Sequence, residues 1–136
     1  MTHLDDIFFG ESASELAVVE IGQSEFDRRF YEAILERNPN NITVLRRLVE
    51  AVARCGCYDR SLALGQRLVE LQPLDFIAHY NLACSHAMLN QVTAGLNALE
   101  RALRLGYSDL AHLEADSDLD ALRLDPRFDK ILAAAA

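Results

Sequence analysis

Cysteines and histidines in the middle of the chain are the residue types that would bind a metal ion or act as redox thiols. Cys55 and Cys57 have one residue between them, and His79, Cys84 and His86 follow. A structural zinc site uses cysteine pairs with two to four intervening residues and a second matching pair, so this spacing is too tight. No Lys or His adjoins the cysteines to lower a thiol pKa. We therefore expect no metal and no cofactor.

Alternating carboxylates near the C-terminus resemble part of a calcium loop. They are Asp116, Asp118 and Asp120. Such a loop needs Gly at its sixth place and Glu at its twelfth, where this chain has Ala121 and Arg127. Helix capping explains these acids better. The chain also has no nucleophile elbow, no glycine-rich phosphate loop and no metalloprotease motif, so we expect a protein that is not an enzyme.

Charge is distributed unevenly over the 136 residues, whose net charge is −8. Residues 1–36 hold nine acidic and two basic side chains, residues 37–104 hold five and eight, and residues 105–136 hold seven and three. A nucleic-acid binder needs an excess of Lys and Arg, so the total opposes that function. A mildly basic centre between acidic ends instead suits a protein partner.

Composition places the chain among soluble single-domain proteins. Its hydrophobic fraction of 51% and charged fraction of 25% are ordinary for that class. The longest apolar runs fall short of the roughly 20 residues that a membrane span needs. Residues 1–10 contain no Lys or Arg and so lack the basic region of a secretory signal. We expect a cytoplasmic protein that does not bind membranes.

Apolar residues recur at helical spacing along most of the chain, and no segment alternates convincingly as a strand does. Gly22, Gly56 and Gly106 are expected to end helices, and Pro39 and Pro73 mark further boundaries. The expected N-terminal capping residues are Ser24, Asn41, Asp59, Asp75, Asp109, Asp118 and Asp125. The sequence therefore predicts an all-α protein.

Two segments of similar design follow each other at a spacing of 34 residues. This interval separates Pro39 from Pro73, Gly22 from Gly56, and Gly56 from Asn90. A fixed period of this length is typical of stacked helix pairs, because one pair cannot bury its apolar face alone.

The residues at equivalent places in the two segments carry a family resemblance. In the first they are Leu45, Leu48, Val49, Val52, Ser61, Gly65, Leu68 and Pro73, and in the second His79, Leu82, Ala83, His86, Gly95, Leu99, Ala102 and Tyr107. This pattern resembles the tetratricopeptide repeat. The tail, Asp109-Leu-Ala-His-Leu followed by Asp118-Leu-Asp-Ala-Leu-Arg and Asp125-Pro-Arg-Phe, resembles the terminal segment that often follows bacterial repeats of this family.

The resemblance implies a short right-handed α-solenoid of antiparallel helix pairs in a single domain, residues 11–136. We expect an irregular lead-in, a degenerate first repeat, two clear repeats and a set of C-terminal capping helices. Their ranges are 1–10, 11–41, 42–75, 76–109 and 110–136.

The family binds proteins or peptides in the concave surface lined by the first helix of each repeat. Carried over to this chain, the peptide-binding positions are Arg46, Arg47, Glu50, Arg54, Tyr80, Asn81, Cys84 and Met88. Arginines pair with carboxylates through two parallel bonds, so these positions favour acidic side chains or a terminal carboxylate. The arginines would alternatively be a solvated face, or would pair with the chain's own acidic N-terminus.

Three hypotheses follow, and the oligomeric state is left open by all of them. The leading one is a protein-protein interaction module with a basic concave groove. The second is a small chaperone or adaptor that associates through an apolar end surface. The third is a thiol or metal-binding protein centred on Cys55 and Cys57. Salt discriminates the first two, because binding driven by charge weakens with ionic strength.

Overall fold

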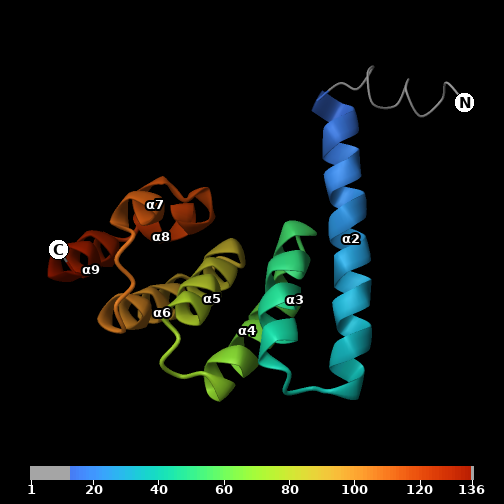
Figure 1. Cartoon of the computed structure of the whole chain (residues 1–136). Coiled ribbons are helices and arrows are strands. Elements are labelled where there is room, and N and C mark those ends of the chain that lie inside the picture. Colours follow the sequence, from blue (N-terminus) through green and yellow to red (C-terminus); the bar gives the residue numbers. More distant parts are fainter. Residues whose placement is uncertain (1–12, 136) are drawn as a thin grey trace, which may run out of the picture.

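The computed structural model describes residues 13–135, with side chains from Gln23 onward except that of Ser24. This part of the chain contains eight α-helices, one short 3-10 helix and no strand (Figure 1). The helices are α2 (Ala13–Arg37), α3 (Ile42–Arg54), α4 (Tyr58–Leu71), α5 (Phe76–Met88), α6 (Val92–Arg104), α7 (Leu110–Ala115), η1 (Ser117–Leu119), α8 (Asp120–Arg123) and α9 (Pro126–Ala135). The all-α prediction is confirmed.

From α3 to α6, each helix packs against the one before it in the chain. Figure 1 shows this succession, from α2 in blue on one side to α9 in red on the other. The tail then turns back, so that η1 and α8 pack on α5 while α8 and α9 pack on α6. No helix in the described part is both long and apolar enough to cross a membrane.

Two apolar clusters form the core. One joins α2, α3 and α4 with Ala78 of α5, and its fully buried members include Leu45, Leu48 and Val52. The other joins α5, α6 and the tail. Val69 of α4 packs against both clusters, so α4 connects the two halves of the core.

The ends of α3 explain why a helix forms there. The Asn41 side chain accepts a hydrogen bond from the Val44 amide at 3.1 Å, which satisfies one of the free amides of the first turn. At the other end Gly56 has φ +76°, and the Cys57 amide donates back to the Val52 carbonyl at 2.9 Å. This left-handed closing turn satisfies carbonyls that the helix leaves open. Both ends were predicted from the sequence.

The same closing turn recurs after α5 and α6. Asn90 lies 34 residues after Gly56 and has φ +58°, and Gly106 has φ +115°. Asn is the residue other than Gly that most readily takes this conformation. The Gln91 amide donates to the His86 carbonyl at 2.9 Å, in the same pattern as Cys57 after α3. The 34-residue period is therefore a real repetition of backbone geometry.

The tail covers the end of the core formed by α5 and α6. Leu113, Leu119 and Leu122 are fully buried, and Phe128 is nearly so. Gly95 of α6 is what allows this close approach, because a Cβ there would lie 2.8 Å from Cδ2 of Leu122.

Four local predictions are wrong. Residues 13–37 form one continuous helix, so Gly22 does not end a helix, Ser24 does not begin one, and the expected first repeat contains one helix in place of two. A helix tolerates one interior glycine at a cost of about 1 kcal/mol. The cap of α4 falls on Cys57 rather than Asp59, and the cap before the α8 segment is Asp116 rather than Asp118. The expected lead-in, residues 1–10, lies outside the described residues.

The other predicted caps are confirmed. Asp75 accepts from the amides of Ile77 and Ala78 at 3.1 and 3.3 Å. Asp109 accepts from the His112 amide at 3.0 Å, and Asp125 accepts from the amide of Arg127 at 2.9 Å.

Candidate binding groove

A groove of about 230 Å³ lies between α3 and α5, and we call it the inner groove. It is lined by Val49, Glu50, Ala53, Arg54, Tyr58, Ser61, Asn81, Cys84, Ser85, Met88 and Asp118. Five of the eight predicted binding residues are among these, namely Glu50, Arg54, Asn81, Cys84 and Met88. The structure therefore brings together most of the predicted set, and adds residues of α4 and η1 to it.

A buried hydrogen bond holds the floor of the inner groove. The Ser61 hydroxyl of α4 and the Ser85 hydroxyl of α5 lie 2.9 Å apart, and both side chains are nearly inaccessible. Each hydroxyl satisfies the other, so neither is left unpaired when the helices pack. This contact fixes α5 relative to α4 and gives the groove a rigid base.

A second cavity of about 430 Å³ adjoins the first, and we call it the aromatic pocket. It is lined by Phe76, Ile77, Tyr80, Asn81, Tyr107, Ser108, Asp109 and His112. The Tyr80 and Tyr107 rings stack with centroids 4.4 Å apart, and Phe76 meets Tyr107 edge to face at 6.2 Å. Asn81 lines both cavities, so the two adjoin at this residue of α5.

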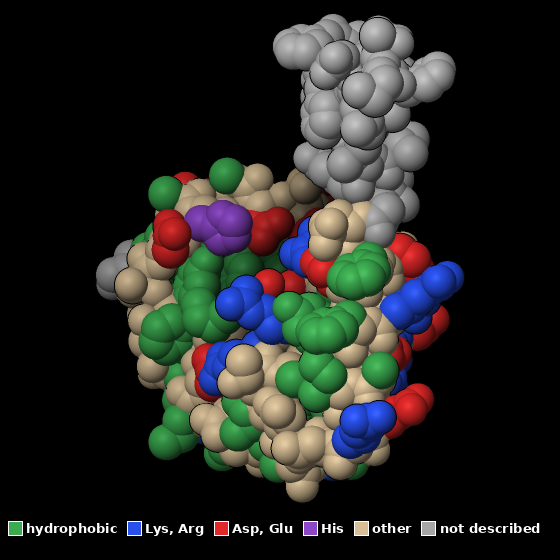
Figure 2. All heavy atoms as spheres, turned by 45° about the vertical axis from the view of Figure 1, so that its right-hand side comes forward, with side chains coloured by type: hydrophobic (Ala, Val, Ile, Leu, Met, Phe, Trp, Pro, Cys, Tyr) green, Lys and Arg blue, Asp and Glu red, His purple; other side chains and the backbone are tan. Residues whose placement is uncertain are grey.

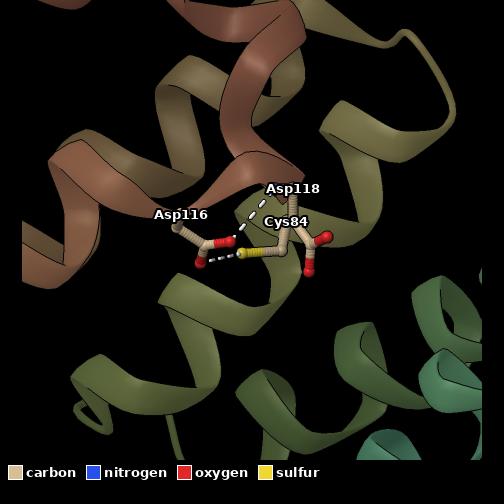
Figure 3. Close-up of side chains that lie close together, drawn as sticks. All are labelled: Cys84, Asp116 and Asp118. Atoms are coloured by element: carbon tan, nitrogen blue, oxygen red, sulfur yellow. Dashed lines mark hydrogen bonds between the residues drawn. The ribbon is translucent and has the colours of Figure 1, made fainter. Parts of the chain in front are cut away.

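Asp116 fastens the tail to α5. Its Oδ2 accepts a hydrogen bond from the Tyr80 hydroxyl at 2.6 Å. The same oxygen lies 3.8 Å from the Cys84 sulfur, and Figure 3 shows these two side chains together. The His112 ring nitrogen lies 3.4 Å from the same oxygen. Burial and the hydrogen bond to Asp116 raise the pKa of Tyr80. Tyr80 therefore remains a neutral donor that positions the tail, and its largely buried ring also lines the aromatic pocket.

Cys84, Asp116 and Asp118 lie close enough to share a metal ion, with ligand atoms within 4.8 Å of one another. Burial, followed by the charges of Asp116 and Asp118, raises the pKa of the Cys84 thiol. Burial likewise raises the pKa of Asp118, and the charges of Asp116 and Asp120 add to this effect. In the structure, hydrogen bonds hold this cluster together, because the Cys84 thiol and the Asp118 amide both donate to the Asp116 carboxylate.

The cysteine and histidine set considered from the sequence is not assembled. All three cysteines are free thiols. His79 bonds the Pro73 carbonyl at 2.9 Å, and His86 bonds the Gln91 side chain at 2.8 Å, so both rings hold local turns. Among the described residues, Cys84 with the two aspartates is the group that meets the distances for a metal ion.

The three predicted arginines are separated by the fold. Arg46 forms an ion pair with Asp75, the residue that caps α5, and so links α3 to α5. Arg47 is exposed and lines neither cavity, whereas Arg54 lines the inner groove. Glu50 and Asp118 line the same groove, so its wall carries both signs of charge.

The space-filling view shows the mixed character of the surface (Figure 2). Hydrophobic side chains gather in a recess on this face, with basic and acidic side chains beside them.

Sequence reasoning missed the contribution of the tail to both cavities. Asp116, Asp118 and His112 reach α5 only because the tail turns back across it, and no local signal announces that contact. Of the residues that line the aromatic pocket, Tyr107 is recognisable in the sequence as an aromatic residue directly after Gly106.

The geometry of the described residues defines a helical protein with a groove along α5. No protein-family model matches the chain. Over 56 residues it is 50% identical to a chloroplastic protein of Arabidopsis thaliana. The match covers 41% of this chain and 17% of that protein, so the chain spans less than a fifth of that relative's length.

Proposed function

We propose that this chain is a non-enzymatic interaction module that holds an extended segment of another protein along α5. The segment would run through the inner groove and the aromatic pocket. The single observation that carries the proposal is the position of Asn81, which lines both cavities. A primary amide both donates and accepts, so it pairs with the backbone of a passing peptide whatever the peptide's sequence.

The lining of the two cavities supports this use. Met88 and Ile77 are 37% and 45% exposed, so they offer apolar contact at opposite ends of α5. Met adapts its shape to different partners. Glu50, Arg54 and Asp118 border the inner groove and would orient a segment through its charges. The hydrogen bond between Ser61 and Ser85 joins α4 to α5 at the base of the groove.

We further propose that the helices form a short right-handed solenoid of the tetratricopeptide type. The repeated closing turns after α3 and α5 support this, as does the packing of each helix on its predecessor. In that arrangement α3 and α5 are the first helices of successive pairs, and both line the inner groove.

Affinity capture with groove variants tests the proposal. A tagged chain is used to recover partners from its native cell, in parallel with Asn81→Ala and Met88→Glu. We expect a partner that is retained by the unaltered chain and lost, or reduced at least about tenfold, by both variants. Arg101→Glu is the matched control, because Arg101 is exposed on α6 and lines neither cavity.

Circular dichroism melts of all four proteins establish that each is folded. Recovery of the same partner by the unaltered chain and by both folded groove variants would show that the partner binds elsewhere. Loss with Arg101→Glu as well would point to a general effect of charge.

A second function, self-association through an apolar surface, is favoured by one observation. Phe26 and Phe30 of α2 are 64% and 53% exposed, and their rings stack with centroids 6.4 Å apart. Sedimentation of the chain and of Phe26→Ser/Phe30→Ser measures this directly. A dimer that persists at high salt and dissociates in the variant supports self-association, and a monomer at all concentrations removes it.

A further inference from the structure

A third cavity lies on another part of the molecule, lined by residues of α2 and α4, and we call it the outer cavity. Its volume is about 560 Å³, and it shares no lining residue with the inner groove or the aromatic pocket. The lining consists of Arg28, Arg29, Glu32, Ala33, Leu35, Glu36, Pro39, Arg60, Leu64 and Arg67. Four arginines and two glutamates therefore face one cavity in a chain whose net charge is −8.

The positive charge at one end of the outer cavity is only partly neutralised. Arg28 and Arg29 share one carboxylate, that of Glu25, which accepts from the Nε of each at 3.0 and 3.2 Å. One carboxylate facing two guanidinium groups leaves a surplus of one positive charge. The Arg29 side chain is 76% exposed, so it remains accessible to an incoming anion.

The other end of the outer cavity carries a second surplus of positive charge. Arg67 donates to the Pro39 carbonyl at 3.2 Å and to the Asn40 side-chain oxygen, and both acceptors are neutral. Its charge is therefore positioned without being cancelled by these contacts. Glu36 lies in the same lining and offsets part of the charge of the two ends.

Between the two ends the charges balance and the floor is apolar. Arg60 forms a two-bond pair with Glu32 at 3.2 and 2.6 Å, which joins α4 to α2. Leu35 and Leu64 are almost fully buried beneath it. Arg29 and Pro39 are 10 residues apart in sequence, so the two surpluses lie roughly 15 Å apart at the helical rise.

We propose that the outer cavity binds an acidic, extended segment of a partner protein. Two carboxylates about 15 Å apart correspond to roughly five residues of extended chain, at about 3.3 Å per residue. Guanidinium groups bind carboxylates through paired, charge-assisted bonds, so such a segment would contact Arg29 at one end and Arg67 at the other. This surface goes beyond the inner groove, and it places an acid-binding site where the sequence did not predict one.

The probe is a short fluorescent peptide of alternating glutamate and serine, compared with its glutamine–serine counterpart. Anisotropy measures binding to the full chain, to Arg29→Glu/Arg67→Glu and to Arg101→Glu. Arg101 is the matched control because it lies 34 residues after Arg67, at the same place in the next helix pair, and does not line the cavity. We expect the double variant to weaken binding at least about tenfold and the control to change it less than about twofold.

The dependence of binding on salt, and a check that the variants are folded, complete the test. Raising the salt concentration from about 0.05 to about 0.5 M should strongly weaken binding of the glutamate peptide to the chain. Because Arg67 also holds the turn at Pro39, a melt checks the fold of the double variant, and Arg29→Glu alone is the second variant should that turn be lost.

Four results would overturn the proposal. The first is no binding of the glutamate peptide, and the second is equal binding of the glutamine peptide. The third is equal binding of the glutamate peptide by folded Arg29→Glu/Arg67→Glu and by the unaltered chain. The fourth is tighter binding of a single-stranded oligonucleotide than of the glutamate peptide. A fifth is tighter peptide binding by Asp5→Asn/Asp6→Asn/Glu11→Gln, which would assign the cavity to the chain's own acidic start.

Discussion

Gly56 shows how a single backbone angle ends a helix. An added Cβ would have no atom within 4 Å, so a substitution there meets no steric obstacle. The substitution would instead destabilise the backbone, because Gly56 has φ +76° and a residue with a side chain is about 1–2 kcal/mol less stable in that conformation. We predict that Gly56→Ala lowers the free energy of unfolding by about that amount in urea denaturation.

The repeat provides the control for Gly56. Asn90 occupies the corresponding turn with φ +58°, and Asn90→Gly removes a side chain from a left-handed position. That substitution should leave stability unchanged or raise it by a few tenths of a kcal/mol. An unchanged midpoint for Gly56→Ala would mean that the turn after α3 adopts another conformation in solution.

The cysteines differ in their environments, and so should differ in reactivity. Burial raises the pKa of the Cys84 thiol, and burial with the Glu25 charge raises that of Cys55, whereas Cys57 is exposed. Only the thiolate reacts, so iodoacetamide at about pH 8 should label Cys57 first and Cys84 last, as read by peptide mass spectrometry. Urea should equalise the three rates. Labelling of Cys84 as fast as Cys57 in the folded chain would contradict the hydrogen-bonded cluster.

At the scale of elements, the helices from α3 to α6 were predictable because their signals are local. Asn41 and Asp75 cap, Gly56 and Gly106 terminate, and the apolar residues repeat with the helical period. The prediction that a helix ends at Gly22 was wrong, because a glycine is only a weak helix breaker when no proline or cap accompanies it. The prediction that Asp59 caps α4 was wrong, because α4 begins one residue before it, at Tyr58.

The contact between α6 and α8 gives a prediction about packing. In Gly95→Ala the new methyl would lie 2.8 Å from Cδ2 of Leu122, whose side chain is fully buried and cannot move into solvent. Overpacking costs about 1–3 kcal/mol, and the gain in helix propensity offsets about 1 kcal/mol of this. We expect a net loss of about 1 kcal/mol in urea denaturation.

A double-mutant cycle isolates that contact. In a Leu122→Ala background the methyl has space, so Gly95→Ala should become neutral or stabilising. Gly65→Ala is the comparison, because its nearest neighbour is Cδ1 of Leu82 at 3.3 Å and less adjustment is needed. Additive effects of Gly95→Ala and Leu122→Ala would mean that α8 does not press on Gly95.

At the scale of the whole molecule, ion pairs near its two ends make stability depend on pH. The hydrogen bond from Arg28 holds the pKa of Glu25 at about 2, against an ordinary 4.5, and Arg127 holds that of Asp125 at about 2, against 3.8. A depressed folded-state pKa stabilises above the unfolded value and loses that contribution as pH falls through the folded one. We therefore predict that the free energy of unfolding falls between about pH 4.5 and pH 2.

Urea midpoints measured across that range check the prediction. Glu25→Gln and Asp125→Asn should each make the fall shallower, because neither amide titrates. Both carboxylates lie at the surface and are screened by solvent, so each effect is small. A pH profile that is the same in both variants and the unaltered chain would assign acid sensitivity to other groups.

The candidate site was only half predictable for a reason that belongs to this scale. Glu50, Asn81 and Met88 follow from their positions on α3 and α5, whereas Asp116 and Asp118 join them through the return of the tail. The pairing of Arg46 with Asp75 likewise depends on how α3 and α5 meet. Contacts between elements far apart in the chain leave no trace in local patterns.

The packing of each helix on its predecessor has a consequence for synthesis. As the chain leaves the ribosome from its N-terminus, every helix from α3 to α6 emerges beside a finished partner, so no apolar face must wait for distant residues. Contacts that are short in sequence also favour rapid folding. The exception is the return of the tail, where Asp116 must find Tyr80 across 36 residues. Until that last segment is translated, the nascent molecule exposes the apolar side of α5 and α6.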